Sequence, residues 1–166
     1  MRLIWIRISI AFAPEDARIG LGRSIDGSEA YAAGVRHFGE SYVQEALPKI
    51  SELKGLDITW HFVGRLQANK TRAIAEHFDW VHTVDRVKIA ERLNEQRPHF
   101  AARLNVLLQI NQGGEEQKAG VSEQDAAALA REVVALPQLA LRGLMTLPPR
   151  EGSAADRKST RLNSSH

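Results

Sequence analysis

The sequence contains no cysteine, which excludes disulfide bonds and thiolate metal sites and is typical of a reducing, cytoplasmic setting. It also lacks any apolar run close to the roughly 20 residues that a membrane-spanning helix needs. The apolar run at its start is interrupted by Arg7, and Pro14, Glu15 and Asp16 follow where a signal peptide would have small residues. We therefore expect a cytoplasmic protein that has no membrane contact.

A basic surface is also missing, although the net charge of the chain is +2. Residues 156–166 contain three basic side chains and one acidic side chain, so this segment alone contributes +3 − 1 = +2. The rest of the chain sums to zero. A protein that binds nucleic acid normally concentrates positive charge on one face, so we expect no nucleic-acid partner.

Familiar catalytic and metal-binding motifs are absent. The six histidines show no His-Glu-x-x-His spacing, and no Gly-x-Ser-x-Gly elbow occurs. No two carboxylates are held together by local spacing for acid–base work. Gly20–Ser24 is too short for a phosphate-binding Walker loop. The sequence thus predicts no metal site and indicates no catalytic residue.

From Tyr31 onward, short apolar runs alternate with amphipathic stretches, a pattern typical of βα units around a parallel sheet. The predicted strands are Val35–Gly39, Thr59–Gly64, Trp80–Val84, Asn105–Asn111 and Leu141–Leu147. The predicted helices are Ser41–Leu53, Asn69–Phe78, Asp85–Gln96 and Ser122–Leu136. Such units suit either a (β/α)8 barrel or a doubly wound sheet.

Several helix ends carry recognisable signals. Asn69, Asp85 and Ser122 are the residue types that cap helix N-termini, and Ser122 begins a variant of the capping box. Pro48 lies inside the first predicted helix, where we expect it to kink the helix or make it restart.

Side chains alternate faces along a strand, so Leu104, Val106, Leu108 and Ile110 share one face of the fourth predicted strand. The opposite face becomes polar towards the end of the strand, at Gln109 and Asn111. Active sites of barrels and open α/β sheets lie at this end. The polar residues therefore indicate either a ligand site or a barrel rim that bonds loop backbone, and the pattern alone does not decide between them.

Four segments resemble motifs of one family: FGESYVQEALPKI (38–50), WHFVGRLQANK (60–70), LNVLLQINQGGEEQKAGV (104–121) and LRGLMTLP (141–148). In this order and spacing they resemble the pyridoxal phosphate homeostasis protein family, which is related to the N-terminal barrel of alanine racemase. The resemblance runs from about Tyr31 to Pro148.

This resemblance implies an α/β fold, an incomplete (β/α)8 TIM barrel of the alanine racemase N-terminal type with about six strands. It implies a protein that binds pyridoxal 5′-phosphate (PLP) and acts in intracellular vitamin B6 homeostasis without catalysis, in transient contact with PLP-dependent apoenzymes. The alternative is a PLP-dependent enzyme similar to amino-acid racemases, which would need a second acid–base group.

The family motifs also indicate residues that approach the cofactor ring. These residues are Ser41, His61, Asn69, Gln109, Asn111 and Met145. The family's Schiff-base lysine, by contrast, is expected near Gly20–Ser24, where Arg23 cannot replace it because a guanidinium stays protonated. Its phosphate site is expected beyond Pro149. Lys70 and Lys118 match family motifs, and we expect both to be solvated.

The predicted organisation has three parts: an aberrant N-terminal segment over residues 1–30, a partial PLP-binding barrel over 31–150, and a disordered tail over 151–166. From residue 156 the tail reads DRKSTRLNSSH, which matches the in-frame translation of a common sequencing adapter, so we interpret it as foreign. A barrel without its last two strands and with an altered first strand cannot close. We therefore expect the 166 residues to form a partial, non-functional chain that aggregates.

Overall fold

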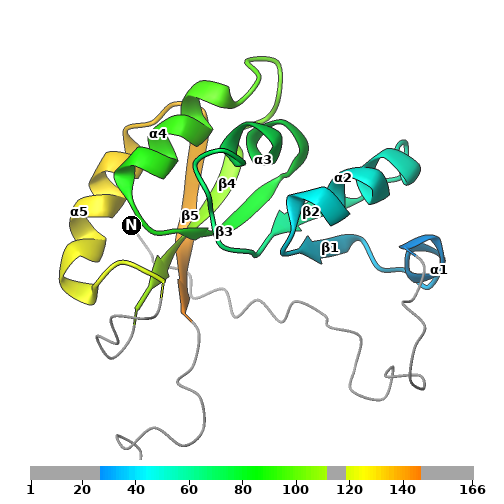
Figure 1. The fold of residues 1–166 in the computed structure, drawn as a ribbon, viewed down its shortest axis with the longest axis horizontal. Helices are drawn as coiled ribbons and strands as arrows, with labels where there is room; N and C mark the ends of the chain where they lie inside the picture. The colour runs from blue at the N-terminus through cyan, green and yellow to red at the C-terminus, as the bar shows by residue number, and fades with distance from the viewer. Residues whose placement is uncertain (1–26, 112–118, 147–166) are drawn as a thin grey trace, which may run out of the picture.

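The computed structural model describes residues 27–111 and 119–146, which form one parallel sheet with helices (Figure 1). Its five strands follow one another in chain order, and each pairs with the strand before it. The strands are β1 (His37–Glu40), β2 (Thr59–Phe62), β3 (Trp80–Val84), β4 (Leu104–Ile110) and β5 (Leu139–Thr146). All five predicted strands are present, with ends that shift by a few residues.

Four helices connect the strands and pack on one face of the sheet (Figure 1). They are α2 (Val43–Glu52), α3 (Thr71–His77), α4 (Val87–Gln96) and α5 (Glu123–Val134). A doubly wound sheet places helices on both faces and reverses its strand order, whereas a barrel keeps sequential order with all helices outside. The described part of the chain therefore has the arrangement of a (β/α) barrel.

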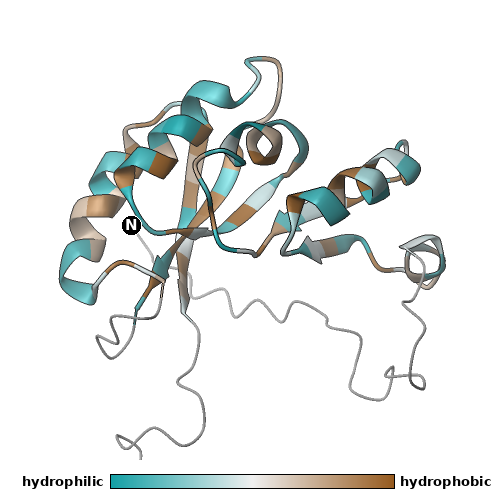
Figure 2. Cartoon of the chain, viewed as in Figure 1, coloured by the Kyte–Doolittle hydropathy of each residue, from teal (hydrophilic) through white to brown (hydrophobic). Residues whose placement is uncertain are grey.

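The hydrophobic core lies between these helices and the sheet. Leu104, Val106, Leu108 and Ile110 belong to it, as the alternation along β4 predicts. Figure 2 shows the matching pattern on the helices, where hydrophobic and hydrophilic stripes alternate along α2 and α4. The opposite sheet face corresponds to the interior of a barrel, and we call it the inner face.

The helix-end predictions have mixed outcomes. The Ser122 side chain accepts a hydrogen bond from the Asp125 backbone N–H at 3.1 Å, which confirms it as the cap of α5. Asn69 and Asp85 are not caps: Lys70 and Arg86 hold those positions without a side-chain cap bond. The Asp85 carboxylate instead pairs with the Arg86 guanidinium at 2.7 Å. Pro48 lies within α2, which is assigned as one helix from Val43 to Glu52, so of the two predicted outcomes the restart does not occur.

A short helix, α1 (Gly27–Ala32), precedes the sheet and was not predicted, because its segment shows no apolar period and buries no residue. The predictions for residues 1–26 and 147–166, including the sites of the missing lysine and phosphate group, lie outside the described residues. Within residues 27–111 and 119–146, no helix is long and apolar enough to cross a membrane.

Candidate functional site

The carboxyl ends of the five strands meet at one edge of the sheet, because all strand pairs are parallel. We call this the C-terminal edge. The predicted site residues lie on strands or on loops that leave this edge: Ser41 after β1, His61 in β2, Asn69 before α3, Gln109 in β4, Asn111 after β4 and Met145 in β5.

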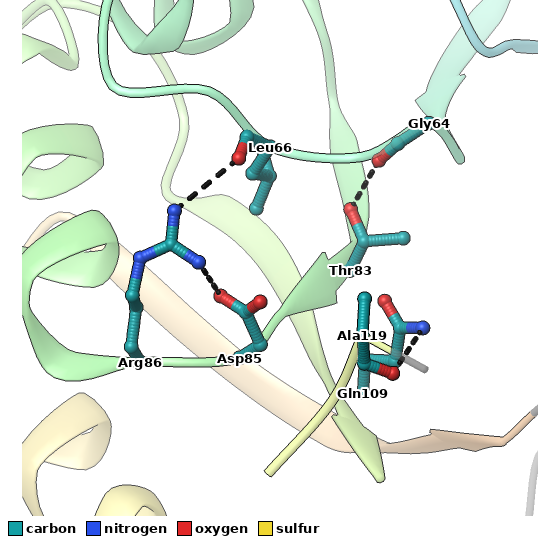
Figure 3. Close-up of polar contacts among 7 residues, drawn as sticks. All are labelled: Gly64, Leu66, Thr83, Asp85, Arg86, Gln109 and Ala119. Carbon is teal, nitrogen blue, oxygen red and sulfur yellow. Dashed lines mark hydrogen bonds and ion pairs between the residues drawn. The ribbon is translucent and has the colours of Figure 1, made fainter. Parts of the chain in front are cut away.

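Gln109 and Met145 are brought together, since they are partners in the register of β4 and β5. Gln109 is buried, and its Nε2 donates to the Ala119 carbonyl at 2.9 Å (Figure 3). Backbone bonds join the same segments: the Val121 N–H donates to the Gln109 carbonyl at 2.8 Å, and the Asn111 N–H donates to the Val121 carbonyl at 2.9 Å. The Gln109 amide thus bonds loop backbone at the barrel rim, one of the two interpretations left open by the sequence.

Ser41 and Asn69 lie on neighbouring loops, and both are exposed. The backbone of Ser41 packs directly on the buried Gly64, where a Cβ would lie 2.9 Å from the Ser41 Cα and even closer to its carbonyl. On the β3 side, the Thr83 Oγ1 donates to the Gly64 carbonyl at 2.6 Å (Figure 3). The ends of β1, β2 and β3 therefore meet around Gly64.

His61 belongs to a row of three histidines on the inner face. Its Nε2 lies 2.9 Å from the His37 Nδ1, and its Nδ1 lies 2.9 Å from the His82 Nε2. The Trp80 ring stacks on His61, with centroids 5.6 Å apart and an interplanar angle of 18°. Both ring nitrogens of His61 are therefore engaged by other histidines.

Burial keeps His61 and His82 uncharged. Loss of hydration lowers the pKa of His61 to about 4, and the neighbouring His82 and His37 lower it further. Burial lowers the pKa of His82 to about 4 as well. At neutral pH, both side chains are therefore neutral imidazoles, each with one N–H and one acceptor nitrogen.

Sequence reasoning named His61 but missed His37, His82 and Thr83. The alternation of side chains along each strand could have predicted that the three histidines share one face. In register, His61 lies beside Gly39 and Trp80, so His37 and His82, two residues away on each neighbouring strand, share its face. No local signal marks Thr83, because its partner Gly64 is 19 residues away in the chain.

Lysines of the described residues lie on helices and turns, and none lies on a strand. Lys49, the first lysine of the sequence, lies in α2, and its Nζ is 2.5 Å from Glu40 Oε1. Lys70 precedes α3 at the N-cap position. No described strand therefore presents an amine to the inner face.

A sheet with sequential parallel strands, helices on one face and polar side chains at its C-terminal edge defines a protein of the (β/α) barrel class. Within that class, a family model described as alanine racemase, N-terminal domain, matches residues 25–164. The chain belongs to this family.

Relatives named pyridoxal phosphate homeostasis protein confirm the resemblance seen in the motifs. The protein of Pseudomonas aeruginosa is 59% identical over 120 residues, which are 72% of this chain and 52% of that protein. The protein of Escherichia coli K12 is 52% identical over 127 residues, which are 75% of this chain and 54% of that protein. The chain thus spans about half the length of these curated relatives.

Solved structures give the same result. PipY of Synechococcus elongatus, a structure described as having PLP bound, is 42% identical with a TM-score of 0.68, covering 78% of this chain and 60% of that one. An alanine racemase of Clostridium difficile is 15% identical with a TM-score of 0.58, covering 72% of this chain and 30% of that one, which shows the shared fold alone.

Proposed function

We propose that this chain is part of a PLP-binding protein that acts in vitamin B6 homeostasis in the cytoplasm and catalyses no reaction. The observation that carries this proposal is the register pair of Gln109 and Met145 at the C-terminal edge, where barrels of this class bind ligands. The relatives' names and the PLP-bound PipY structure support it. Residues 31–150 are the proposed partial binding barrel.

The described residues suit the ring of PLP but not its aldehyde. The Gln109 Nε2 is engaged with the Ala119 carbonyl, so the amide oxygen of Gln109 and the thioether of Met145 on the adjacent strand are the groups offered to the cofactor. They suit a flat heteroaromatic ring, which needs hydrogen bonds and polarizable contacts. The aldehyde needs a lysine amine, and none lies on a described strand. The residues therefore fit the ring but not the covalent attachment, and we derive no covalent step for this chain.

Titration of the chain with PLP at low micromolar concentration tests this proposal against the expectation from the sequence that the 166 residues alone are non-functional. Trp60 and Trp80 are the fluorescent reporters. We expect saturable quenching that weakens about tenfold in Gln109→Leu, because the substitution removes the amide oxygen at the edge and the bond that ties the Ala119 loop to it. Gln124→Leu, on the exposed surface of α5, is the matched control and should bind like the parent chain. Quenching that never saturates would contradict the proposal.

Borohydride reduction of the PLP-treated chain, followed by mass spectrometry, tests the lack of a covalent anchor. We expect no stoichiometric adduct at a single site, because no lysine within residues 27–111 and 119–146 lies on a strand, where the inner face would hold an amine beside the cofactor. A unique adduct at Lys70 or Lys118 would show that one of them has replaced the family's lysine.

We propose that the protein catalyses no racemisation, because a racemase needs two proton-transferring groups on opposite sides of the cofactor ring. The His61 imidazole has both nitrogens engaged in the histidine row. We also propose that PLP-dependent apoenzymes make transient contact with the protein. Clear amino-acid racemisation by the PLP-treated chain would favour the alternative, a racemase-like enzyme.

A further inference from the structure

The loop between β2 and α3 is held by side chains of Thr83 in β3, Arg86 at the N-cap of α4 and Arg92 in α4. They bond alternate carbonyls: Thr83 Oγ1 to Gly64 at 2.6 Å, Arg86 Nη2 to Leu66 at 3.4 Å, and Arg92 Nε to Ala68 at 3.2 Å. Figure 3 shows the first two bonds. We call residues 64–70 the edge loop.

This alternation sets the direction of the side chains. The carbonyls of Gly64, Leu66 and Ala68 accept the bonds of Thr83, Arg86 and Arg92, and the Leu66 side chain is buried with 3% exposure. The Ala68 carbonyl also accepts from the Thr71 Oγ1 at 2.9 Å. Arg65, Gln67 and Asn69, which alternate with these residues, are all exposed. The edge loop thus presents a row of polar side chains to solvent.

Thr83 makes the shortest of the three bonds, and it does so inside the protein. Thr83 is 4% exposed and Gly64 is buried, so water has little access to the Gly64 carbonyl. The Arg86 bond is long, and the Arg92 Nε also donates to the Thr71 Oγ1 at 3.3 Å. Both hydrogen bonds are therefore weaker than that of Thr83. Thr83 is therefore the main tie between β3 and the edge loop.

The position of Gly64, fixed by Thr83, also determines the position of the loop after β1. Because the Ser41 backbone packs on the Gly64 Cα without room for a Cβ, a movement of Gly64 displaces Ser41 as well. Ser41 and Asn69, two of the residues predicted to approach the cofactor, lie on the two loops that meet here.

We propose that Thr83 is a positioning residue: its hydroxyl fixes Gly64, and through Gly64 it sets the edge loop and the Ser41 loop in the arrangement that receives the ligand. Thr83 itself does not contact the ligand. The part of this inference that concerns the ligand rests on the proposed PLP binding, whereas the part that concerns the loops does not.

Two substitutions separate the hydroxyl from the shape of the side chain. Thr83→Val keeps the branched shape and removes the donor, while Thr83→Ser keeps the donor. Trypsin reports on the ligand-free loop, because Arg65 and Lys70 are cleavage sites within it, and Arg131 in α5 is an internal control for global opening. PLP titration at low micromolar protein reports on the ligand.

We expect Thr83→Val to raise cleavage after Arg65 and Lys70 about tenfold, with cleavage after Arg131 unchanged, and to weaken PLP binding by a similar factor. Thr83→Ser should restore both. Unchanged cleavage in Thr83→Val would overturn the proposal, and so would faster cleavage with unchanged PLP affinity, since Thr83 would then be structural only. If the parent chain binds no PLP, the proposed function fails, and the trypsin comparison still decides whether Thr83 holds the loop.

Discussion

The histidine row on the inner face has a limited capacity for protons. Each imidazole–imidazole hydrogen bond needs one N–H and one lone pair, so both bonds of His61 survive only while each linking pair of nitrogens shares a single proton. Full protonation of His61, however, turns both its nitrogens into donors and demands that both neighbours accept.

Acid should therefore destabilise the fold through these side chains. His61 and His82 have an unfolded pKa near 6.5 and a folded pKa of about 4, so the unfolded chain binds more protons between these values. The free energy of unfolding should be unaffected above pH 6.5 and fall as the pH drops towards 4. We expect a loss of about 1–2 kcal/mol per histidine, after allowance for solvent screening.

Urea denaturation at several pH values measures this effect. In His82→Asn the decline between pH 6.5 and 4 should be shallower, because one of the two titrating groups is gone. The exposed His77→Asn is the matched control and should keep the slope of the parent chain. Equal slopes in all three proteins would contradict the assignment.

Arg97 is a buried cation that no sequence pattern indicated. It is 5% exposed, and it donates to the carbonyls of Ala75, Phe78 and Ala102 at 2.7–2.8 Å. Burial lowers its pKa, and nearby Asp79 opposes that shift. The guanidinium therefore satisfies backbone at the end of α3 that water does not reach.

Replacement of Arg97 by Met should lower the free energy of unfolding by about 2–4 kcal/mol, because the carbonyls of Ala75 and Phe78 lose a charged donor at buried hydrogen bonds and Ala102 loses its partner as well. Arg72→Met is the control: Arg72 is exposed, and its Nη1 lies 3.7 Å from Glu76, so its loss should change stability by less than about 0.5 kcal/mol. Urea denaturation at pH 7 compares the two, and similar losses would count against this account of Arg97.

At the scale of the elements, the interiors of strands and helices were predictable and their junctions were not. The apolar alternation in β4 and the spacing of Ile89 and Leu93 in α4 identify what each element buries, because burial follows the local period. Whether a residue caps a helix depends on which partner its side chain bonds, the helix backbone or a neighbouring side chain. Asp85 has the right chemistry for a cap, yet Arg86 beside it takes the carboxylate.

The candidate site was predictable only in part for the same reason. The position of Gln109 near the end of a strand follows from local alternation, whereas its partner Ala119 depends on how the loop returns. The close approach of Gly64 and Ser41 joins residues far apart in the chain and leaves no local trace. Strand-end residues can thus be named from sequence, but their contacts cannot.

Gly64→Ala tests the junction of the first three strand ends. A Cβ at this position would overlap the backbone of Ser41, which cannot turn aside as a flexible side chain could. We expect a loss of about 2 kcal/mol or more in the free energy of unfolding. Gly55→Ala is the matched control: its φ of +95° makes a side chain strained, but nothing lies within 4 Å, so about 1 kcal/mol is expected. A smaller loss at Gly64 than at Gly55 would contradict the packing described.

At the scale of the whole molecule, the sheet has two open sides within residues 27–111 and 119–146. β1 pairs only with β2, and β5 pairs only with β4, among the described strands. Leu144 on β5 is 37% exposed. Unpaired strand edges and exposed apolar side chains favour pairing between chains.

We expect the 166-residue chain to self-associate as its concentration rises, which size-exclusion chromatography with light scattering measures. Leu144→Lys should shift the distribution towards monomer, because a lysine on an edge strand opposes edge-to-edge pairing. A monodisperse monomer at every concentration would show that both edges are protected.

The sequential order of the strands also bears on how the chain folds during synthesis. Because every strand pairs with the one immediately before it, a growing chain can add each βα unit as it leaves the ribosome, without waiting for a distant segment. The contacts between successive strands join residues that are close in the sequence, so adding each strand closes only a short loop and costs little entropy. The order of the strands thus allows the sheet to assemble from its N-terminal strand onward.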